Sequence, residues 1–233
     1  MSPSPSFQPC FSSLTFDFLE TLAANNSRDW FAGHKQDYED KVRTPALSFI
    51  MSAGERLPQF APHFVADSRK MGGSLMRVYR DTRFSKDKTP YKTNIGIQFR
   101  HEAGKDVHAP GYYVHISAAE CFVGIGIWHP PSEALANIRT AIVEQPQDWS
   151  EALHDTQFSR WFALSGNSLK TAPRGFDKTH PLLDDLKRKD FIAIAKLPPA
   201  LIEQEDFSAI CCDYFTVGAP FMRFLCTALR LPF

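Results

Sequence analysis

The sequence predicts an α+β domain in which a mostly antiparallel β-sheet is packed with N-terminal and C-terminal helices. Two observations carry this prediction. Apolar residues recur at helical spacing over residues 14–57 and again after residue 131, whereas they alternate with polar residues at strand spacing between residues 75 and 128. Helices, then consecutive strands, then helices are typical of a meander of about four or more strands flanked by helices.

Three helices are expected in the first part of the chain. The first begins at Leu14 and stops at Asn25. Ser27 can cap the second, which is expected to continue to residue 42, because a serine hydroxyl accepts hydrogen bonds from the first free backbone N–H groups. Pro45 can occupy the first turn of the third helix, which is expected to end near Leu57, just before two further prolines.

The middle of the chain is expected to form the sheet. Its four predicted strands are 75–80, 94–100, 111–118 and 121–128. The last two are close enough in sequence to form a hairpin, and segment 101–110 is expected to join the second and third.

The rest of the chain is expected to return to helices with two more strands. Ser132 and Pro146 are expected to begin two helices, and Pro199 a third. Strands are expected over 158–164 and 191–195, an ordered loop over 169–178, a short helix over 182–189, and a terminal helix over 206–229 that is interrupted near Gly218. Residues 1–13 are expected to be a flexible tail and residues 14–233 a single domain.

Alternation along the expected strands separates two faces of the sheet. The apolar face, expected to lie under helices, holds Met76, Val78, Ile95, Ile97, Phe99, Val114, Ile116, Val123, Ile125 and Ile127. The other face holds Arg77, Tyr79, Gln98, Arg100, Tyr113, His115, Ser117, Phe122 and Trp128, with Gly96, Gly124 and Gly126 among them. Three interpretations of this second face stay open: a solvated face, a concave face that binds anionic and planar groups, or a face covered by a helix.

Segment 77–94, RVYRDTRFSKDKTPYKTN, is the functional centre that the sequence predicts. It has six positive and two negative residues, in a chain whose 26 Lys and Arg balance 26 Asp and Glu. Its positive charge is therefore local, which favours a compact phosphate- or carboxylate-bearing anion as the ligand. The expected ligand-binding residues are Arg77, Arg80, Arg83, Lys88 and Tyr91, with Arg174 from a separate loop.

Catalysis at this segment is left open by the sequence. The candidates for acid or base chemistry are Asp81, Asp87, Tyr91 and His115. The sequence contains no P-loop, no dinucleotide fingerprint at a helix start and no nucleophile elbow, so no cofactor is expected. The histidines lack a recognised metal-ligand spacing, and the five cysteines are odd in number, so no metal site or disulfide framework is expected.

Two other interpretations of segment 77–94 remain. It could contact the phosphates of a nucleic acid, or a protein partner, although the overall neutrality counts against a long polyanion. It could also be a structural latch whose Arg–Asp pairs hold helices on the sheet. The sequence shows no signal peptide and no apolar stretch of spanning length, so a soluble cytoplasmic protein without a membrane partner is expected. The oligomeric state is left open.

Three strings in the chain resemble a known family. They are RVYRDTRFSKDKTPYKT, the upstream FLETLAANNSRDWF and the downstream LKTAPRGFDKTHP, and together they resemble the domain of unknown function 2461 of bacterial and fungal proteins over about residues 16–191. The central pattern falls on Arg77, Arg80, Asp81, Arg83, Phe84, Asp87, Lys88 and Tyr91. The resemblance implies one intact domain and supplies no reaction.

Overall fold

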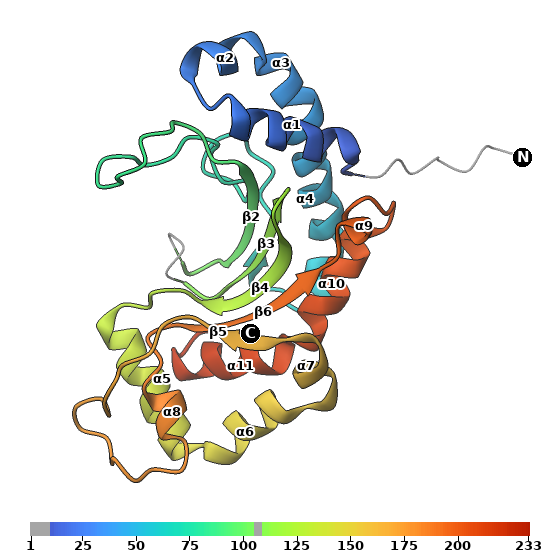
Figure 1. Cartoon of the computed structure of the whole chain (residues 1–233). Coiled ribbons are helices and arrows are strands. Elements are labelled where there is room, and N and C mark those ends of the chain that lie inside the picture. Colours follow the sequence, from blue (N-terminus) through green and yellow to red (C-terminus); the bar gives the residue numbers. More distant parts are fainter. Residues whose placement is uncertain (1–9, 105–108) are drawn as a thin grey trace, which may run out of the picture.

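A curved, six-stranded antiparallel sheet forms the centre of the protein (Figure 1). The computed structural model describes residues 10–104 and 109–233. The strands, in chain order, are β1 (Phe64–Val65), β2 (Asn94–His101), β3 (Gly111–Ser117), β4 (Cys121–Ile127), β5 (Ala163–Ser165) and β6 (Phe191–Leu197). Their order across the sheet is β1-β2-β3-β4-β6-β5, so the predicted α+β class is confirmed.

Helices precede and follow the central strands, as the sequence predicts. The first group is α1 (Ser13–Ala24), α2 (Arg28–Gly33), α3 (Lys35–Tyr38), a π-helical turn (Glu39–Arg43), α4 (Thr44–Arg56) and a 3₁₀ turn (Leu57–Gln59). The second group is α5 (Ser132–Glu144), α6 (Pro146–His154), α7 (Thr156–Trp161), α8 (Leu183–Leu186), α9 (Pro199–Ile202), α10 (Phe207–Val217) and α11 (Ala219–Ala228). The predicted break in the terminal helix at Gly218 is confirmed.

The convex side of the sheet forms the core together with α4, α10 and α11 (Figure 1). Phe99 of β2 packs against Phe49 of α4, at 6.3 Å between ring centroids, and against Phe215 of α10, at 6.0 Å. The predicted apolar residues of β2, β3 and β4 are all buried on this side. Their burial removes a large apolar area from water, which is the main favourable contribution to folding.

The concave side of the sheet carries the opposite residues of each strand. Antiparallel register places Gln98 beside Tyr113, Tyr113 beside Gly124, and Gly124 beside Ile194. In the part of the chain that the structure describes, the helices cover the convex side and the two ends of the sheet and leave the concave side open (Figure 1). The interpretation in which a helix covers the glycine-bearing face is therefore wrong for the described residues.

The N-terminal helices hold segment 77–94 against the end of the sheet. Ser27 caps α2 as predicted, since its hydroxyl accepts a hydrogen bond from the Trp30 N–H at 3.3 Å. In the same helix, Phe31 stacks on Tyr91 with ring centroids 4.1 Å apart and an angle of 18°. The expected second helix is interrupted, because α2 ends at Gly33 and α3 begins anew at Lys35.

Segment 75–80 does not form the predicted strand. It has only two isolated bridges, Leu75 to Ile97 and Tyr79 to Tyr91, because the chain pairs briefly with the edge of β2 and then turns away. The first bridge aligns Met76 with Gly96, and the backbone N–H of Met76 donates to the Gly96 carbonyl at 2.9 Å. Met76 therefore lies on the concave side, and its assignment to the helix-covered face was wrong.

The strand predicted over 158–164 is also wrong for most of its length. Residues Thr156–Trp161 form α7, and only the short β5 follows. The cause is Asp155, whose carboxylate accepts hydrogen bonds from the backbone N–H groups of Gln157 and Phe158 at 2.9 and 3.0 Å. Such capping satisfies N–H groups at a helix start and stabilises the helix by about 1 kcal/mol.

Residues 10–13, which the sequence assigned to the tail, are part of the folded domain. Phe11 is 1% exposed and packs against Phe49 and Phe207, so part of the expected tail belongs to the core. Residues 1–9 of the expected tail lie outside the described residues. So do residues 105–108 of the predicted 101–110 connection.

Among the described residues, no single helix is long and apolar enough to cross a membrane. Helices α10 and α11 reach the required length and composition only together, and a bend of 56° separates them.

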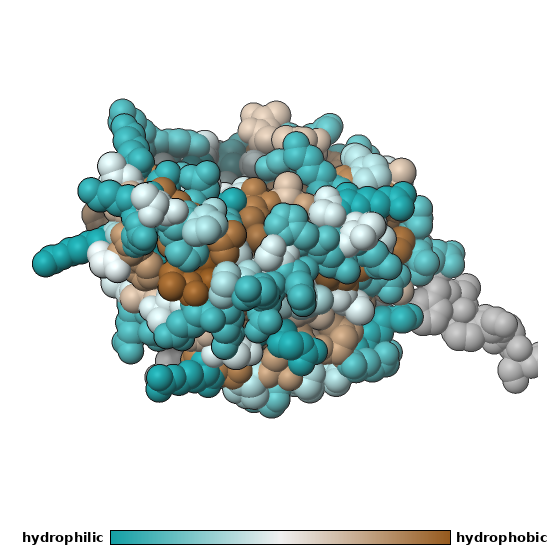
Figure 2. All heavy atoms as spheres, turned by 90° about the horizontal axis from the view of Figure 1, so that it is seen from below, coloured by the Kyte–Doolittle hydropathy of each residue, from teal (hydrophilic) through white to brown (hydrophobic). Residues whose placement is uncertain are grey.

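The face seen from below carries apolar side chains in patches between hydrophilic ones (Figure 2).

Candidate functional site

A cavity of about 380 Å³ lies on the concave face of the sheet. Its walls are mainly apolar and aromatic. They include Met76, Tyr113, Phe122, Trp128 and Ile194, with Gln98 as a polar member. The sequence placed Gln98, Tyr113, Phe122 and Trp128 on one face together with the glycines, and the structure brings them together.

Two glycines of this face have different roles. A Cβ atom added at Gly124 would meet its nearest neighbours, in Tyr113 and Ala193, only at ordinary contact distances of 3.8–3.9 Å. Because Gly124 has no side chain, the cavity is deeper at this position. A Cβ atom added at Gly96 would lie 2.8 Å from the Tyr113 hydroxyl, so the ring of Tyr113 occupies the space above Gly96.

A polar cluster lies at one end of the cavity. The Tyr113 hydroxyl is 3.2 Å from Nδ1 of His115, and Nδ2 of Asn94 is 3.5 Å from the same atom. Both neighbours can donate a hydrogen bond, so Nδ1 is the acceptor and Nε2 carries the proton. The His115 ring stacks on Phe122 at 4.6 Å and 5°.

Burial shifts the ionisation of this cluster toward the neutral forms. It raises the pKa of Tyr113 to about 12. It lowers the pKa of His115, with a smaller opposing effect from the Glu120 carboxylate. A half-buried imidazole loses hydration when it is charged, which explains the direction. The cluster therefore offers hydrogen bonds without a charge near neutral pH.

Segment 77–94 folds as an irregular hairpin. Its two arms are joined by the hydrogen bonds from the Arg80 N–H to the Pro90 carbonyl, at 2.9 Å, and from the Lys92 N–H to the Val78 carbonyl, at 2.7 Å. The Arg80 guanidinium contacts the Asp87 carboxylate and the Thr89 hydroxyl, and so closes the loop between the arms. These contacts lie within the hairpin itself, so they do not hold a helix on the sheet as the latch interpretation requires.

Three more candidate residues of the hairpin loop also have partners. Arg83 donates to Asp81 through Nε at 3.0 Å and Nη2 at 2.7 Å. Lys88 Nζ donates to the Thr82 carbonyl at 2.9 Å. The hydrogen bonds from Arg83 lower the pKa of Asp81 to about 2, and those from Arg80 and then Thr89 lower the pKa of Asp87 to about 2. Both carboxylates are thus held ionised and paired rather than poised as acids or bases.

Arg77 and Lys92 are two of the three remaining basic residues of the segment, beside Lys86. Arg77 is exposed and directly follows Met76, which lines the cavity. Burial lowers the pKa of Lys92, and the nearby positive charge of Arg77 lowers it further. No ion pair of either residue occurs within the described part of the chain. An anion bound near both residues would relieve the repulsion between their positive charges.

A separate polar hollow of about 460 Å³ lies between the hairpin and the end of α1. Arg80, Asp87, Tyr91, Lys92 and Asn26 contribute to its walls. The motif therefore lines a concave surface, although Asp87 neutralises the cation that faces it. Tyr91 is 5% exposed, and burial raises its pKa, so it contributes mainly its stacked ring.

Arg174 is not brought together with the motif. Its exposed loop lies beside α8, at the end of the sheet opposite segment 77–93 (Figure 1). Among residues 10–104 and 109–233, no group of three or more His, Cys, Asp or Glu is placed to hold a metal ion.

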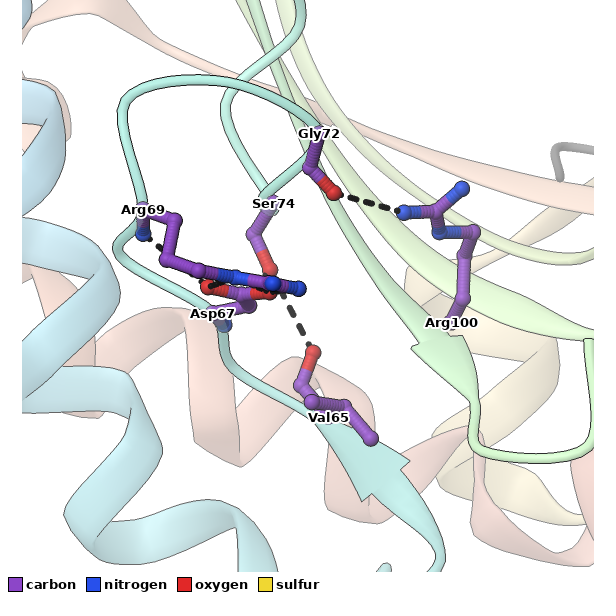
Figure 3. Close-up of polar contacts among 6 residues, drawn as sticks. All are labelled: Val65, Asp67, Arg69, Gly72, Ser74 and Arg100. Atoms are coloured by element: carbon purple, nitrogen blue, oxygen red, sulfur yellow. Dashed lines mark hydrogen bonds and ion pairs between the residues drawn. The ribbon is translucent and has the colours of Figure 1, made fainter. Parts of the chain in front are cut away.

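A loop beside β2 borders the concave face (Figure 3). Arg69 binds the Asp67 carboxylate, and the Ser74 hydroxyl joins Asp67 N–H to the Val65 carbonyl, at 3.0 and 3.3 Å. Arg100 extends from β2 toward this loop, and its Nη2 is 3.4 Å from the Gly72 carbonyl. The loop thereby positions the one arginine that β2 places on the concave face.

Sequence reasoning missed His129 and Asp190 as a pair. Asp190 is 0% exposed, and its Oδ1 lies 2.7 Å from His129 Nδ1 and 2.8 Å from His129 N. Its Oδ2 accepts from the Asn167 N–H at 2.8 Å. The two residues lie 61 positions apart, and no local pattern joins them. The only signal was that each stands at the end of an expected strand.

Comparison with known families supports the resemblance seen in the sequence. A family model described as "Conserved hypothetical protein (DUF2461)" matches residues 14–224, which is most of the chain. No curated protein and no solved structure matches.

Proposed function

This chain belongs to the DUF2461 family, and we propose that it binds a small anionic ligand with a flat apolar body on the concave face of its sheet. The observation that carries the proposal is the cavity of about 380 Å³ opened by Gly124. Small-molecule sites in proteins are commonly apolar cavities of about 300–1,000 Å³ with a few polar groups that fix orientation.

The apolar body would lie over Gly124. Phe122 of β4 and Trp128, which directly follows β4, present aromatic surface at either side of this glycine, and Ile194 of β6 adds an aliphatic wall. Aromatic side chains suit a flat ligand because offset stacking adds about 0.5–1.5 kcal/mol per pair beyond the apolar area removed from water.

The anionic group would lie toward Arg77 and Lys92. Lys92 lies two residues before Asn94, which contacts the His115 cluster, and the positive charge of Arg77 acts on Lys92. An anion there would relieve the repulsion between the two cations. Arg80, Arg83 and Lys88 would then shape the hairpin and add to its positive field, rather than contact the ligand directly.

The test uses two fluorescent probes with the same apolar core. 8-Anilinonaphthalene-1-sulfonate carries a sulfonate, and N-phenyl-1-naphthylamine carries no charge. Gly124→Leu fills the cavity and is expected to weaken binding of both probes by about tenfold or more, corresponding to about 1.4 kcal/mol. Arg77→Gln with Lys92→Gln is expected to weaken binding of the sulfonate probe only.

Gly33→Leu is the matched control, because a Cβ atom at Gly33 of α2 would meet nothing within 4 Å. Melting curves verify that each variant is folded. Unchanged probe binding by folded Gly124→Leu would refute the proposal. Binding of a single-stranded oligonucleotide that weakens steeply as salt rises would instead favour the nucleic-acid interpretation.

A further inference from the structure

Asp190 lies on the same face of β6 as the cavity floor. Side chains alternate along a strand, and Ile192 and Ile194 both line the cavity, so the position two residues before Ile192 faces the same side. Asp190 is nevertheless fully buried, because the segment around Gly166 covers it: a Cβ atom at Gly166 would lie 2.5 Å from that of Asp190. A buried carboxylate is costly unless hydrogen bonds satisfy it.

Both carboxylate oxygens of Asp190 are satisfied, and one of them holds an imidazole. Oδ1 accepts from the His129 N–H at 2.8 Å and lies 2.7 Å from Nδ1 of the same residue. The negative charge of this carboxylate favours a proton on Nδ1, which leaves the lone pair of the neutral imidazole on Nε2. The His129 side chain is 46% exposed, so a ligand can reach the ring.

The backbone at His129 is strained in a way that serves this geometry. Its φ is +48°, in the left-handed region that few residues other than glycine adopt. Regular alternation would turn residue 129 away from the side of Trp128. Instead its ring stacks on Trp128, with centroids 4.1 Å apart and an angle of 29°. Trp128 lines the cavity, so a ligand that covers Trp128 comes within reach of His129.

We propose that His129 accepts a proton from a hydroxyl group on the flat ligand of the concave face, and that Asp190 is the residue that positions it. This inference rests on the proposed binding function and names the substrate class: an aromatic or enolic hydroxyl at one end and an anionic group at the other. The two ends match the His129 end of the face and the end near Arg77 and Lys92.

The proton transfer is balanced within the site. The O–H bond of the ligand breaks, its electron pair stays on oxygen, and an N–H bond forms at Nε2. The products are an oxyanion and an imidazolium, and the buried Asp190 carboxylate stabilises the imidazolium as an ion pair, with Oδ1 2.7 Å from Nδ1. Return of the proton regenerates the neutral imidazole, so no other reactant is required.

The test uses 7-hydroxycoumarin-4-acetic acid, which has a carboxylate at one end and a hydroxyl at the other. Its neutral and ionised hydroxyl forms absorb at different wavelengths, so the absorbance of the bound probe reports proton transfer directly. The methoxy analogue, 7-methoxycoumarin-4-acetic acid, has no hydroxyl proton and measures binding alone. Wild-type protein is expected to enrich the ionised form of the bound hydroxyl probe relative to free probe at the same pH.

Three variants distinguish a role of His129 and Asp190 in proton transfer from a purely structural role. His129→Gln is expected to lose the enrichment and still bind the methoxy analogue, and Asp190→Asn is expected to reduce the enrichment where it folds. His63→Gln is the control, because His63 is also paired with a carboxylate, that of Glu102 at 2.7 Å, but lies next to β1 outside the cavity. It is expected to keep the full enrichment.

The outcomes distinguish this inference from the binding proposal. Failure of wild-type protein to bind the methoxy analogue contradicts both. Binding of both probes without enrichment of the ionised form, or enrichment that persists in His129→Gln, overturns the proton-transfer role alone. A lower melting temperature of His129→Gln with an unchanged absorbance band would assign the pair a structural role only.

Discussion

Asn26 and Tyr91, 65 positions apart, exchange two hydrogen bonds: Nδ2 of Asn26 donates to the Tyr91 carbonyl at 2.9 Å, and the Tyr91 N–H donates to Oδ1 of Asn26 at 3.0 Å. The side-chain amide thereby pairs with a backbone residue as a neighbouring strand would. It ties the hairpin of segment 77–94 to the end of α1, and the stacking of Phe31 on Tyr91 reinforces the link.

Asn26→Ala is expected to lower the free energy of unfolding by about 1–3 kcal/mol, because it leaves a donor and an acceptor of the nearly buried Tyr91 without their partner. Urea denaturation measures the loss. Asn25→Ala is the control, since Asn25 Nδ2 contacts only the Thr21 carbonyl at an exposed site. Equal losses in the two variants would show that the Asn26 link contributes nothing of its own.

Asp87→Asn is expected to loosen the hairpin, because Asp87 binds Arg80 in one arm and Thr89 in the other. Asp81→Asn is the matched variant, since Asp81 pairs, within the described part of the chain, only with Arg83 two residues away. Limited proteolysis within residues 80–90 should accelerate several-fold in the first variant and little in the second. Similar cleavage of both would contradict the closure role of Asp87.

The contact between Asp87 and Arg80 also determines the pH below which the hairpin opens. Its folded-state pKa of about 2 lies below the ordinary value of 3.8. A lowered carboxyl pKa contributes stability that is complete above the unfolded value and is lost as pH falls through the folded value. The hairpin should therefore resist proteolysis at pH 5 and lose this protection between about pH 4 and 2, as an acid-active protease would reveal. Asp87→Asn should lack this transition.

Gly126→Ala is expected to destabilise the sheet by more than about 1 kcal/mol, whereas Gly124→Ala should be nearly neutral. Gly126 has a φ of +116°, and a Cβ atom there would overlap the Phe191 carbonyl of the neighbouring strand. Gly124 has ordinary contact distances only. Thermal and urea unfolding of the two variants provide the measurement, and equal stability would argue against a strained backbone at Gly126.

The His115 imidazole should make the free energy of unfolding fall under mildly acidic conditions. Burial lowers its folded-state pKa below the ordinary 6.5, so its contribution is present above pH 6.5 and is lost as pH falls toward the folded value. The free energy of unfolding should therefore drop between pH 7.5 and 5. His115→Gln should show a smaller drop over this interval, and an identical pH profile would assign the dependence to other groups.

The sequence predicted the sheet best where alternation was complete. Residues Asn94 to Phe99 alternate strictly, and so does β3, and both form strands as expected. Segment 75–80 also alternates, yet only Leu75 and Tyr79 form bridges. Propensity indicates an extended chain, but whether an edge is free to pair depends on contacts made by other segments.

The sequence predicted which residues share the face of the candidate site, but not which of them pair with one another. Alternation alone placed Tyr113, His115 and Trp128 on one face with the glycines, because strand geometry requires it. It did not show that Arg80 and Arg83 would be occupied by carboxylates of their own loop. Nor did it join His129 to Asp190, since that contact depends on the order of the strands.

The strand order has a consequence for how the protein folds. Strands β2, β3 and β4 are consecutive neighbours, whereas β6 reaches β4 only after a long excursion through four helices. Closing such a long loop is entropically costly and slow, so the meander should form first and β6 should dock late. Kinetic φ-values near 1 for Val114→Ala and near 0 for Ala195→Gly would demonstrate this order. The contact between His129 and Asp190 would then form only at the last step, so that a partly folded chain holds a sheet but no proton acceptor.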